Sequence, residues 1–408
     1  MSAPTLQTDL PHKNKTLEKL KARRKRWLDV HLWLGLGFGF FLAIIGLTGS
    51  VLVFWHELDE AINQSLYEAE PSVNLKPKSF DEILAAAKQN APKGWNSVWL
   101  DAPQENGNYV FGFYYPEASP KPEEAESLNI VVNPYTAEVT GRRVFYHSWH
   151  PLKHSFVGFL FKLHYALFLG ETGGTIVGIL AVFFFVSVMT GLILWWPLTG
   201  NWKRVLTIKR RASTERFNHD LHQSAGFYSL IVMMCLLMSG LYFNLPDQFR
   251  WLVERFSTLT PEVEAKVSVE LHKQDFPIQN ALSRAQALYK DATAHFYTFG
   301  NSENATVTAC YKDIPSLRSK VLDMGCVVID PISGDILQIK DSAHGSGGDV
   351  FMQWQWPLHS GAAFGWTGRI LVFITGLLCP LIFVTGVIRW LQKRRAKSFK
   401  KNIVQSIE

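Results

Sequence analysis

Four histidines at matched positions in two halves of the 408-residue sequence are the residues best suited to chemistry. His31 and His222 each stand in the pattern Asp-x-His-x-x-x-Gly, and His164 and His359 each follow a leucine and precede Gly-x-Thr-Gly by six residues. Two imidazoles that face each other across helices are the axial ligands that a six-coordinate haem iron takes from a protein. The sequence therefore predicts two haem sites, one between His31 and His222 and the other between His164 and His359.

The residues around these histidines allow a second interpretation. Gly35 and Gly226 come one helical turn after His31 and His222, where the absence of a side chain lets a flat macrocycle approach the backbone. The same glycines could instead serve close helix packing. A single histidine at a membrane boundary could also merely hydrogen-bond a carbonyl or a lipid headgroup. The repetition of all four histidines favours ligation.

The aspartates and Thr-Gly pairs near the histidines are expected to shape the helices and not to bind a cofactor. Asp29 and Asp220 lie two positions before their histidines, on a different helical face, and are interpreted as helix-start residues in preference to hydrogen-bond acceptors that orient the histidines. The Thr-Gly pairs at 190–191 and 385–386 are interpreted as packing or bending sites. Leu167 and Phe168 are bulky, and they weaken the case for a macrocycle beside His164.

Four apolar stretches are long enough to position these histidines in a bilayer, since about 20 residues rising about 1.5 Å each cross its apolar core. The expected spans are residues 27–55, 164–198, 219–244 and 358–391. The first is too long, and too poor in a small-residue cleavage site, for a removable signal peptide. Matching of the first span with the third and of the second with the fourth indicates an internal duplication.

Lysine and arginine clusters orient these spans. They lie in residues 1–26, 199–218 and 392–408, and such clusters collect on the cytoplasmic side. Both termini are therefore expected in the cytoplasm. Because each cluster abuts a span, the net charge of +6 is assigned to topology and lipid headgroups, with no nucleic-acid partner.

The two segments between the spans of each half, 56–163 and 245–357, are predicted to be extracytoplasmic domains. Each begins with an amphipathic helix, at 79–90 and 278–292, and continues with alternating strands such as 108–115 and 321–330. A helix followed by an antiparallel sheet is the simplest fold for both. Cys310 and Cys326 lie on two strand-like runs of the second domain and could form a disulfide in an oxidising compartment.

The turns at 133–138 (NPYTAE) and 330–335 (DPISGD) resemble those of PepSY domains. The surrounding LH…GxTG…TG…W and DxHxxxG patterns resemble the PepSY-associated transmembrane family, and the two-half layout is most similar to the FoxB-type inner-membrane ferrisiderophore reductases. The resemblance covers about residues 27–390. It implies a membrane all-α four-helix bundle with two α+β PepSY-like periplasmic domains, located in a bacterial inner membrane.

The resemblance further implies two haem b groups and an enzyme that passes electrons to a ferric siderophore in the periplasm, releasing its iron. No GxGxxG opens a helix, so a separate cytoplasmic donor or a quinol is expected to supply the electrons. No GxSxG, HExxH or P-loop is present, which disfavours hydrolases and ATPases.

The electron acceptor is expected at aromatic and histidine residues that precede the second and fourth spans. These residues are His147, Trp149, His150, Trp354 and Trp356. Aromatic side chains gather at any membrane interface, so this assignment has a purely structural alternative. For the whole chain, the alternatives are a haem-free PepSY protein that binds or transports a periplasmic ligand, and a structural scaffold.

Overall fold

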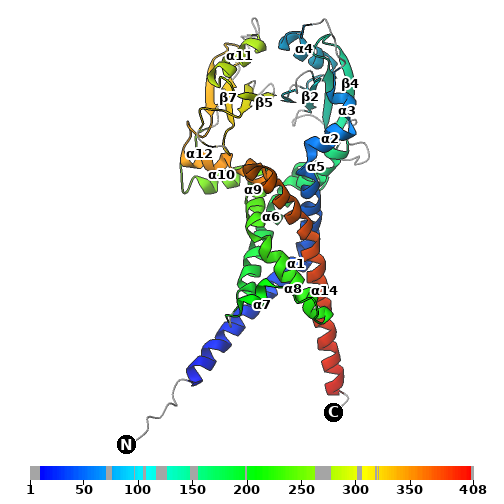
Figure 1. The fold of residues 1–408 in the computed structure, drawn as a ribbon, viewed down its shortest axis with the longest axis vertical. Coiled ribbons are helices and arrows are strands. Elements are labelled where there is room, and N and C mark those ends of the chain that lie inside the picture. Colours follow the sequence, from blue (N-terminus) through cyan, green and yellow to red (C-terminus); the bar gives the residue numbers. More distant parts are fainter. Residues whose placement is uncertain are drawn as a thin grey trace, which may run out of the picture. The chain divides into compact units, whose positions relative to one another are not determined.

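A computed structural model describes most of the chain as helices and one antiparallel sheet (Figure 1). The described residues are 10–69, 76–95, 97–103, 107–115, 126–147, 155–197, 200–261, 277–300, 306–317, 319 and 321–405. The chain divides into two compact units. We call residues 1–50, 176–243 and 371–408 the helical unit, and residues 51–175 and 244–370 the sheet unit.

Three helices are long and apolar enough to cross a membrane. They are α1 (Leu10–Leu52), α6 (Gly170–Trp195) and α14 (Gly365–Gln405). Helices α8 (Thr214–Tyr228) and α9 (Leu230–Asn244) meet at a bend of 59° and make a fourth span if they cross together. The described part of the chain therefore contains three candidate membrane spans, or four if the bent pair is counted as one span.

The predicted second and fourth spans begin too early. His164 lies on the short helix α5 (Phe156–Ala166), and His359 lies on α13 (Gln355–Ser360), so neither histidine belongs to a spanning helix. Leu167 and Gly361 end these helices in the left-handed conformation, which turns the chain, and the Leu167 amide donates to carbonyls of the last turn of α5. The sequence is apolar on both sides of each helix end, so hydropathy did not reveal that α5 and α13 are separate from the spanning helices.

The assignment of Asp29 and Asp220 to helix starts is wrong. Helix α1 is already continuous from Leu10, and α8 begins at Thr214, where the Ser213 hydroxyl accepts the Arg216 amide as an N-cap. Asp220 is buried in the interior of α8 and lies 2.7 Å from the Arg216 guanidinium. The helices extend past the apolar stretches, so hydropathy does not mark their ends.

Within the described residues, eight antiparallel strands form a single sheet in the order β4-β3-β2-β1-β5-β6-β7-β8. The strands are β1 (Ser97–Asp101), β2 (Tyr109–Tyr114), β3 (Ser127–Val132), β4 (Val139–Tyr146), β5 (Thr293–Phe299), β6 (Val307–Lys312), β7 (Gly325–Ile329) and β8 (Ile336–Lys340). Strands β1 and β5 join the halves of the sheet, with Leu100 opposite Tyr297. The predicted strands at 108–115 and 321–330 are confirmed as β2 and β7, but the joining of the two domains was not predicted.

Helices α4 (Phe80–Asn90) and α11 (Ile278–Leu288) confirm the two amphipathic helices predicted for the soluble segments. Their apolar faces share one buried core with the strands. Their first turns are connected, because the Asp81 carboxylate accepts the amides of Ile278 and Gln279, while the Gln279 side chain accepts the amide of Phe80. Each helix thus satisfies N-terminal amides of the other.

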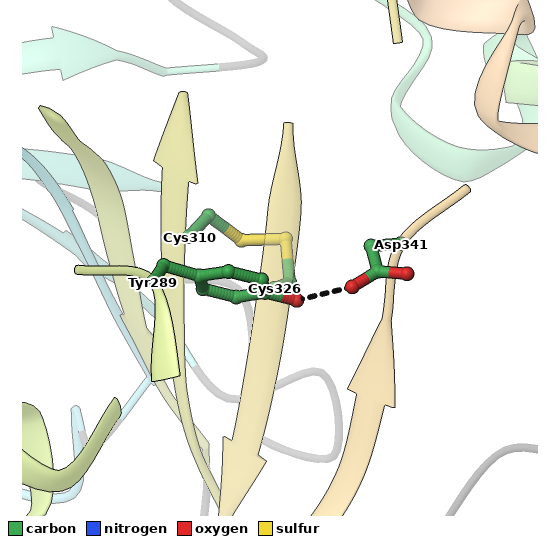
Figure 2. The surroundings of a disulfide bond; sticks show 4 residues. All are labelled: Tyr289, Cys310, Cys326 and Asp341. Carbon is green, nitrogen blue, oxygen red and sulfur yellow. Dashed lines mark hydrogen bonds between the residues drawn. A yellow bond between two sulfur atoms is a disulfide. The ribbon is translucent and has the colours of Figure 1, made fainter. Parts of the chain in front are cut away.

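The Cys310–Cys326 disulfide is present between facing positions of β6 and β7 (Figure 2). Beside it, the buried Tyr289 hydroxyl donates to the Asp341 carboxylate across 2.7 Å. The His344 imidazole also lies 2.8 Å from this carboxylate. The carboxylate therefore connects the end of β8 to the residue that follows α11.

The remaining helices flank the sheet or lie in the connections. They are α2 (Trp55–Ile62), α3 (Gln64–Tyr67), α7 (Trp202–Leu206), α10 (Pro246–Val253), α12 (Gly347–Gln353) and the 3₁₀ helix η3 (Ala362–Phe364). Two ion pairs with buried carboxylates fasten helices to the first half of the sheet. Asp59 of α2 binds Arg143 of β4, and Lys162 of α5 lies 2.8 Å from Glu126 beside β3.

Candidate functional site: two histidine pairs

His31 of α1 and His222 of α8 lie side by side within the helical unit. Their ring centroids are 6.2 Å apart, and the ring planes are nearly perpendicular, at 80°. An imidazole nitrogen lies about 2 Å from a bound metal, so two rings on opposite sides of one ion have centroids about 6 Å apart. Ordinary edge-to-face contacts between rings have centroid distances in the same range, about 4.5–7 Å. The contacts of the ring nitrogens are therefore needed to distinguish a metal-binding pair from an ordinary ring contact.

The Nδ1 atoms of both rings form hydrogen bonds with residues of neighbouring helices. His31 Nδ1 lies 2.9 Å from the Ser187 carbonyl and 3.3 Å from the Thr190 hydroxyl, both on α6. His222 Nδ1 lies 3.0 Å from the Ile382 carbonyl and 3.0 Å from the Thr385 hydroxyl, both on α14. Metal-ligating histidines are typically oriented in this way, through the ring nitrogen that does not bind the metal.

Glycines shape the space around these rings. A Cβ atom added to Gly191 or Gly386 would lie 3.2 or 3.3 Å from the Cε1 atom of His31 or His222, closer than such atoms normally pack. By contrast, a Cβ atom added to Gly35 or Gly226 would meet nothing within 4 Å. Open space one turn from each histidine is what a macrocycle lying against the helix requires.

His164 and His359 form the second pair, within the sheet unit. Their ring centroids are 6.0 Å apart, and the ring planes meet at 66°. The two histidines come from the short helices α5 and α13. The separation of the rings is therefore nearly the same as in the helical unit, although the supporting elements differ.

Two polar residues of α5, Lys162 and Tyr165, flank His164 in the sequence. Lys162 lies over the ring of Tyr146, 4.4 Å from its centroid, and over that of Tyr165 at 5.3 Å. Burial lowers the pKa of Lys162, but Tyr165 and the Glu126 carboxylate outweigh it and raise that pKa. Burial is the main cause of the raised pKa of Tyr146. A cation is thus held two residues before His164.

These pairs suit a group that needs only two protein ligands. Among the described residues, no cluster of three or more His, Cys, Asp or Glu side chains could hold a metal ion. Haem iron receives four ligands from its own porphyrin and takes two imidazoles from the protein. The separation of the two imidazoles, the engaged Nδ1 atoms and the open space beside Gly35 and Gly226 fit haem in the helical unit.

The residues predicted to contact an electron acceptor are only partly described. His147 directly follows β4 and is 2% exposed, so it is not a surface residue. Trp354 is partly buried between α12 and α13, whereas Trp356 on α13 is 46% exposed. Trp149 and His150 lie outside the described residues. Trp356 is therefore the most accessible described member of this set.

The Thr-Gly pairs at 190–191 and 385–386 were underestimated as mere packing or bending sites. Both contact the histidines of the helical unit. A signal for this role was available, because each pair lies about two turns from the basic end of its predicted span, near the depth of about one turn expected for His31 and His222. Composition alone could not show that the side chains face the rings.

No curated protein shows significant similarity to the chain. The profile of the family described as the PepSY-associated TM region matches residues 28–393, nearly the whole chain. The chain therefore belongs to the PepSY-associated TM region family.

Proposed function

We propose that the chain is a two-haem inner-membrane reductase that passes electrons from a cytoplasmic donor or a quinol to a ferric siderophore in the periplasm. The observation that carries this proposal is the recurrence of one arrangement, two neighbouring imidazoles whose centroids lie 6.2 Å apart in one pair and 6.0 Å apart in the other. His31 and His222 would hold one haem b, and His164 and His359 would hold the other.

The residues of the chain would bind and orient the two groups. Haem supplies reversible one-electron transfer when it is bound. The carbonyls of Ser187 and Ile382 hold the Nδ1 side of each imidazole in the helical unit, which would leave Nε2 of each ring to bind the iron. Gly35 and Gly226 leave the adjacent helix surfaces open.

The proposed topology rests on the charge distribution and on the repeated motifs. Lysine and arginine clusters at 1–26, 199–218 and 392–408 favour cytoplasmic termini, with α8 and α9 crossing together as a bent fourth span. In a duplicated four-span bundle, matching contacts such as Thr190 with His31 and Thr385 with His222 are expected. The sheet unit would then lie in the periplasm, where the Cys310–Cys326 disulfide is stable.

Reduction is an effective way to release iron from a siderophore. The hard oxygen ligands of such chelates suit ferric iron better than the softer ferrous ion. The exposed Trp356, three residues before His359, is the proposed point of approach for the chelate. A stacked aromatic contact there would bring the acceptor close to the second histidine pair.

Absorption spectra of the purified protein test this proposal. We expect a Soret band and an α-band that sharpen on reduction with dithionite, with about two haems per chain by pyridine haemochrome assay. Adding a ferric hydroxamate siderophore to the reduced protein without oxygen should restore the oxidised spectrum. A colourless protein would exclude the reductase and would favour a haem-free protein that binds or transports a periplasmic ligand.

A further inference from the structure

We infer that the pairs Thr190–Gly191 and Thr385–Gly386 are positioning residues that fix the ligating atom and the ring orientation of His31 and His222. This inference rests on the proposed haem binding and deepens it. Each pair lies on a long helix opposite its histidine, and Thr190 and Thr385 are almost fully buried, at 1% and 3% exposure.

The first step concerns the hydrogen on each imidazole. A carbonyl oxygen can only accept a hydrogen bond, so Nδ1 of His31, 2.9 Å from the Ser187 carbonyl, must carry the hydrogen. The same holds for His222, whose Nδ1 lies 3.0 Å from the Ile382 carbonyl. A neutral imidazole with a hydrogen on Nδ1 has its free lone pair on Nε2. Nε2 is therefore the atom available to a metal in both rings.

The second step concerns the threonine hydroxyls. Thr190 donates its hydrogen to the Ser187 carbonyl across 2.8 Å, and Thr385 donates its hydrogen to the Leu381 carbonyl across 2.7 Å. Each hydroxyl oxygen is then left to accept from the imidazole as a second acceptor. The threonine and the carbonyl thus hold each Nδ1–H from two directions, which resists rotation of the ring.

The third step concerns the glycines. Each ring places its Cε1 edge against a glycine, and even one methyl group at Gly191 or Gly386 would press on that edge at 3.2 or 3.3 Å. The glycine therefore determines how closely the imidazole ring approaches the opposite helix, and the threonine determines the rotation of the ring about its own bond to the histidine backbone. Together they maintain the near-perpendicular planes of 80° between His31 and His222.

Two properties of a bound haem would follow from this arrangement. Perpendicular axial imidazoles give ferric low-spin haem a strongly anisotropic electron paramagnetic resonance (EPR) signal, with a larger highest g value than parallel rings give. Donation from Nδ1–H also makes the imidazole a more basic ligand. A more basic ligand stabilises the ferric state, and the midpoint potential of the haem falls.

The test compares full-length Thr385→Val and Gly386→Ala with Thr375→Val. Thr375 is equally buried on the same helix, at 3% exposure, and serves as the matched control. Haem content, the EPR spectrum and the midpoint potentials are measured on each protein. For Thr385→Val we expect both haems to be retained, one of the two potentials to rise, and one highest g value to change. Gly386→Ala should change the same g value, and Thr375→Val should change neither quantity.

Conservative replacement separates positioning from folding. Thr385→Ser keeps the hydroxyl group and should restore the EPR signal and potential of the unmodified protein, even if Thr385→Val binds less haem. If Thr385→Val and Gly386→Ala retain haem with unchanged spectra and potentials, the positioning role is wrong and haem binding stands. If the unmodified protein contains no haem, the proposed function itself is wrong.

Discussion

The two histidine pairs reach nearly the same ring separation on different supports. His31 and His222 lie on α1 and α8, helices of 43 and 15 residues, and their Nδ1 atoms are held by carbonyls of α6 and α14. His164 and His359 lie on helices of 11 and 6 residues that end in left-handed turns. The comparison shows that helices of very different length can hold two imidazoles at nearly the same separation.

The largest expected effect comes from removing one ligand of each pair. His222→Ala and His359→Ala should each lose about half of the bound haem, because each change removes an axial ligand from one site only. Haem per chain and the EPR spectrum measure this, and the two variants should lose different signals. Loss of both signals from either single change would contradict the independence of the two pairs.

The second largest expected effect is a loss of stability in the sheet unit when the buried Lys162–Glu126 ion pair is broken. Lys162→Met leaves the Glu126 carboxylate buried without its cation, and breaking such a pair typically costs about 3–5 kcal/mol of the free energy of unfolding. Urea unfolding in detergent, followed by tryptophan fluorescence, would measure the loss. The double variant Lys162→Met/Glu126→Leu is the control and should recover most of the stability. EPR features assigned to His31 and His222 should remain unchanged in both.

The third effect depends on pH and involves Asp341 beside the disulfide. Burial raises the pKa of Asp341, but hydrogen bonds from Tyr289, His344 and backbone amides outweigh burial and lower that pKa. A lowered pKa stabilises the folded state above the ordinary pKa of a carboxyl group, and this contribution is lost as the pH falls through the folded-state pKa. Asp341→Asn should therefore lower the melting temperature at pH 7, and the difference should shrink in acid. An equal difference at both pH values would contradict a role for the charge.

The smallest effect contrasts two glycines. Gly170 has a φ of +60°, so Gly170→Ala should cost about 1–2 kcal/mol through strain alone, since an added Cβ meets nothing within 4 Å. Gly37 is helical and equally open, so Gly37→Ala should be neutral or should stabilise by up to about 1 kcal/mol. Thermal unfolding of both variants measures the difference. If both variants changed the stability equally, the positive φ of Gly170 would not constrain which residue can stand there.

Much of the local structure could be predicted from the sequence, because the relevant signals are short-range. Periodic apolar residues predicted α4 and α11, and the Asn133 and Asp330 turns form with side-chain oxygens accepting the amides two residues later. Facing strand positions made the Cys310–Cys326 disulfide possible, and it is present. These features depend on neighbours within one or two elements.

The errors concern properties that apolar composition cannot encode. The breaks after His164 and His359 depend on backbone conformations at Leu167 and Gly361, and hydropathy does not report conformation. The contacts of Thr190 and Thr385 with the histidines depend on which helix faces which. The pairing of β1 with β5 joins residues far apart in the chain, and no local pattern specifies it.

The β1–β5 pairing also constrains how the protein can be made. Leu100 must wait for Tyr297, about 200 residues later, before the sheet can close. At a synthesis rate of about 5–20 residues per second, the edge of β1 that later pairs with β5 stays open for roughly 10–40 s, while the other edge can already pair with β2. An open strand edge is a template for pairing with other chains. During that interval the free edge of β1 is open to pairing with a strand of another chain.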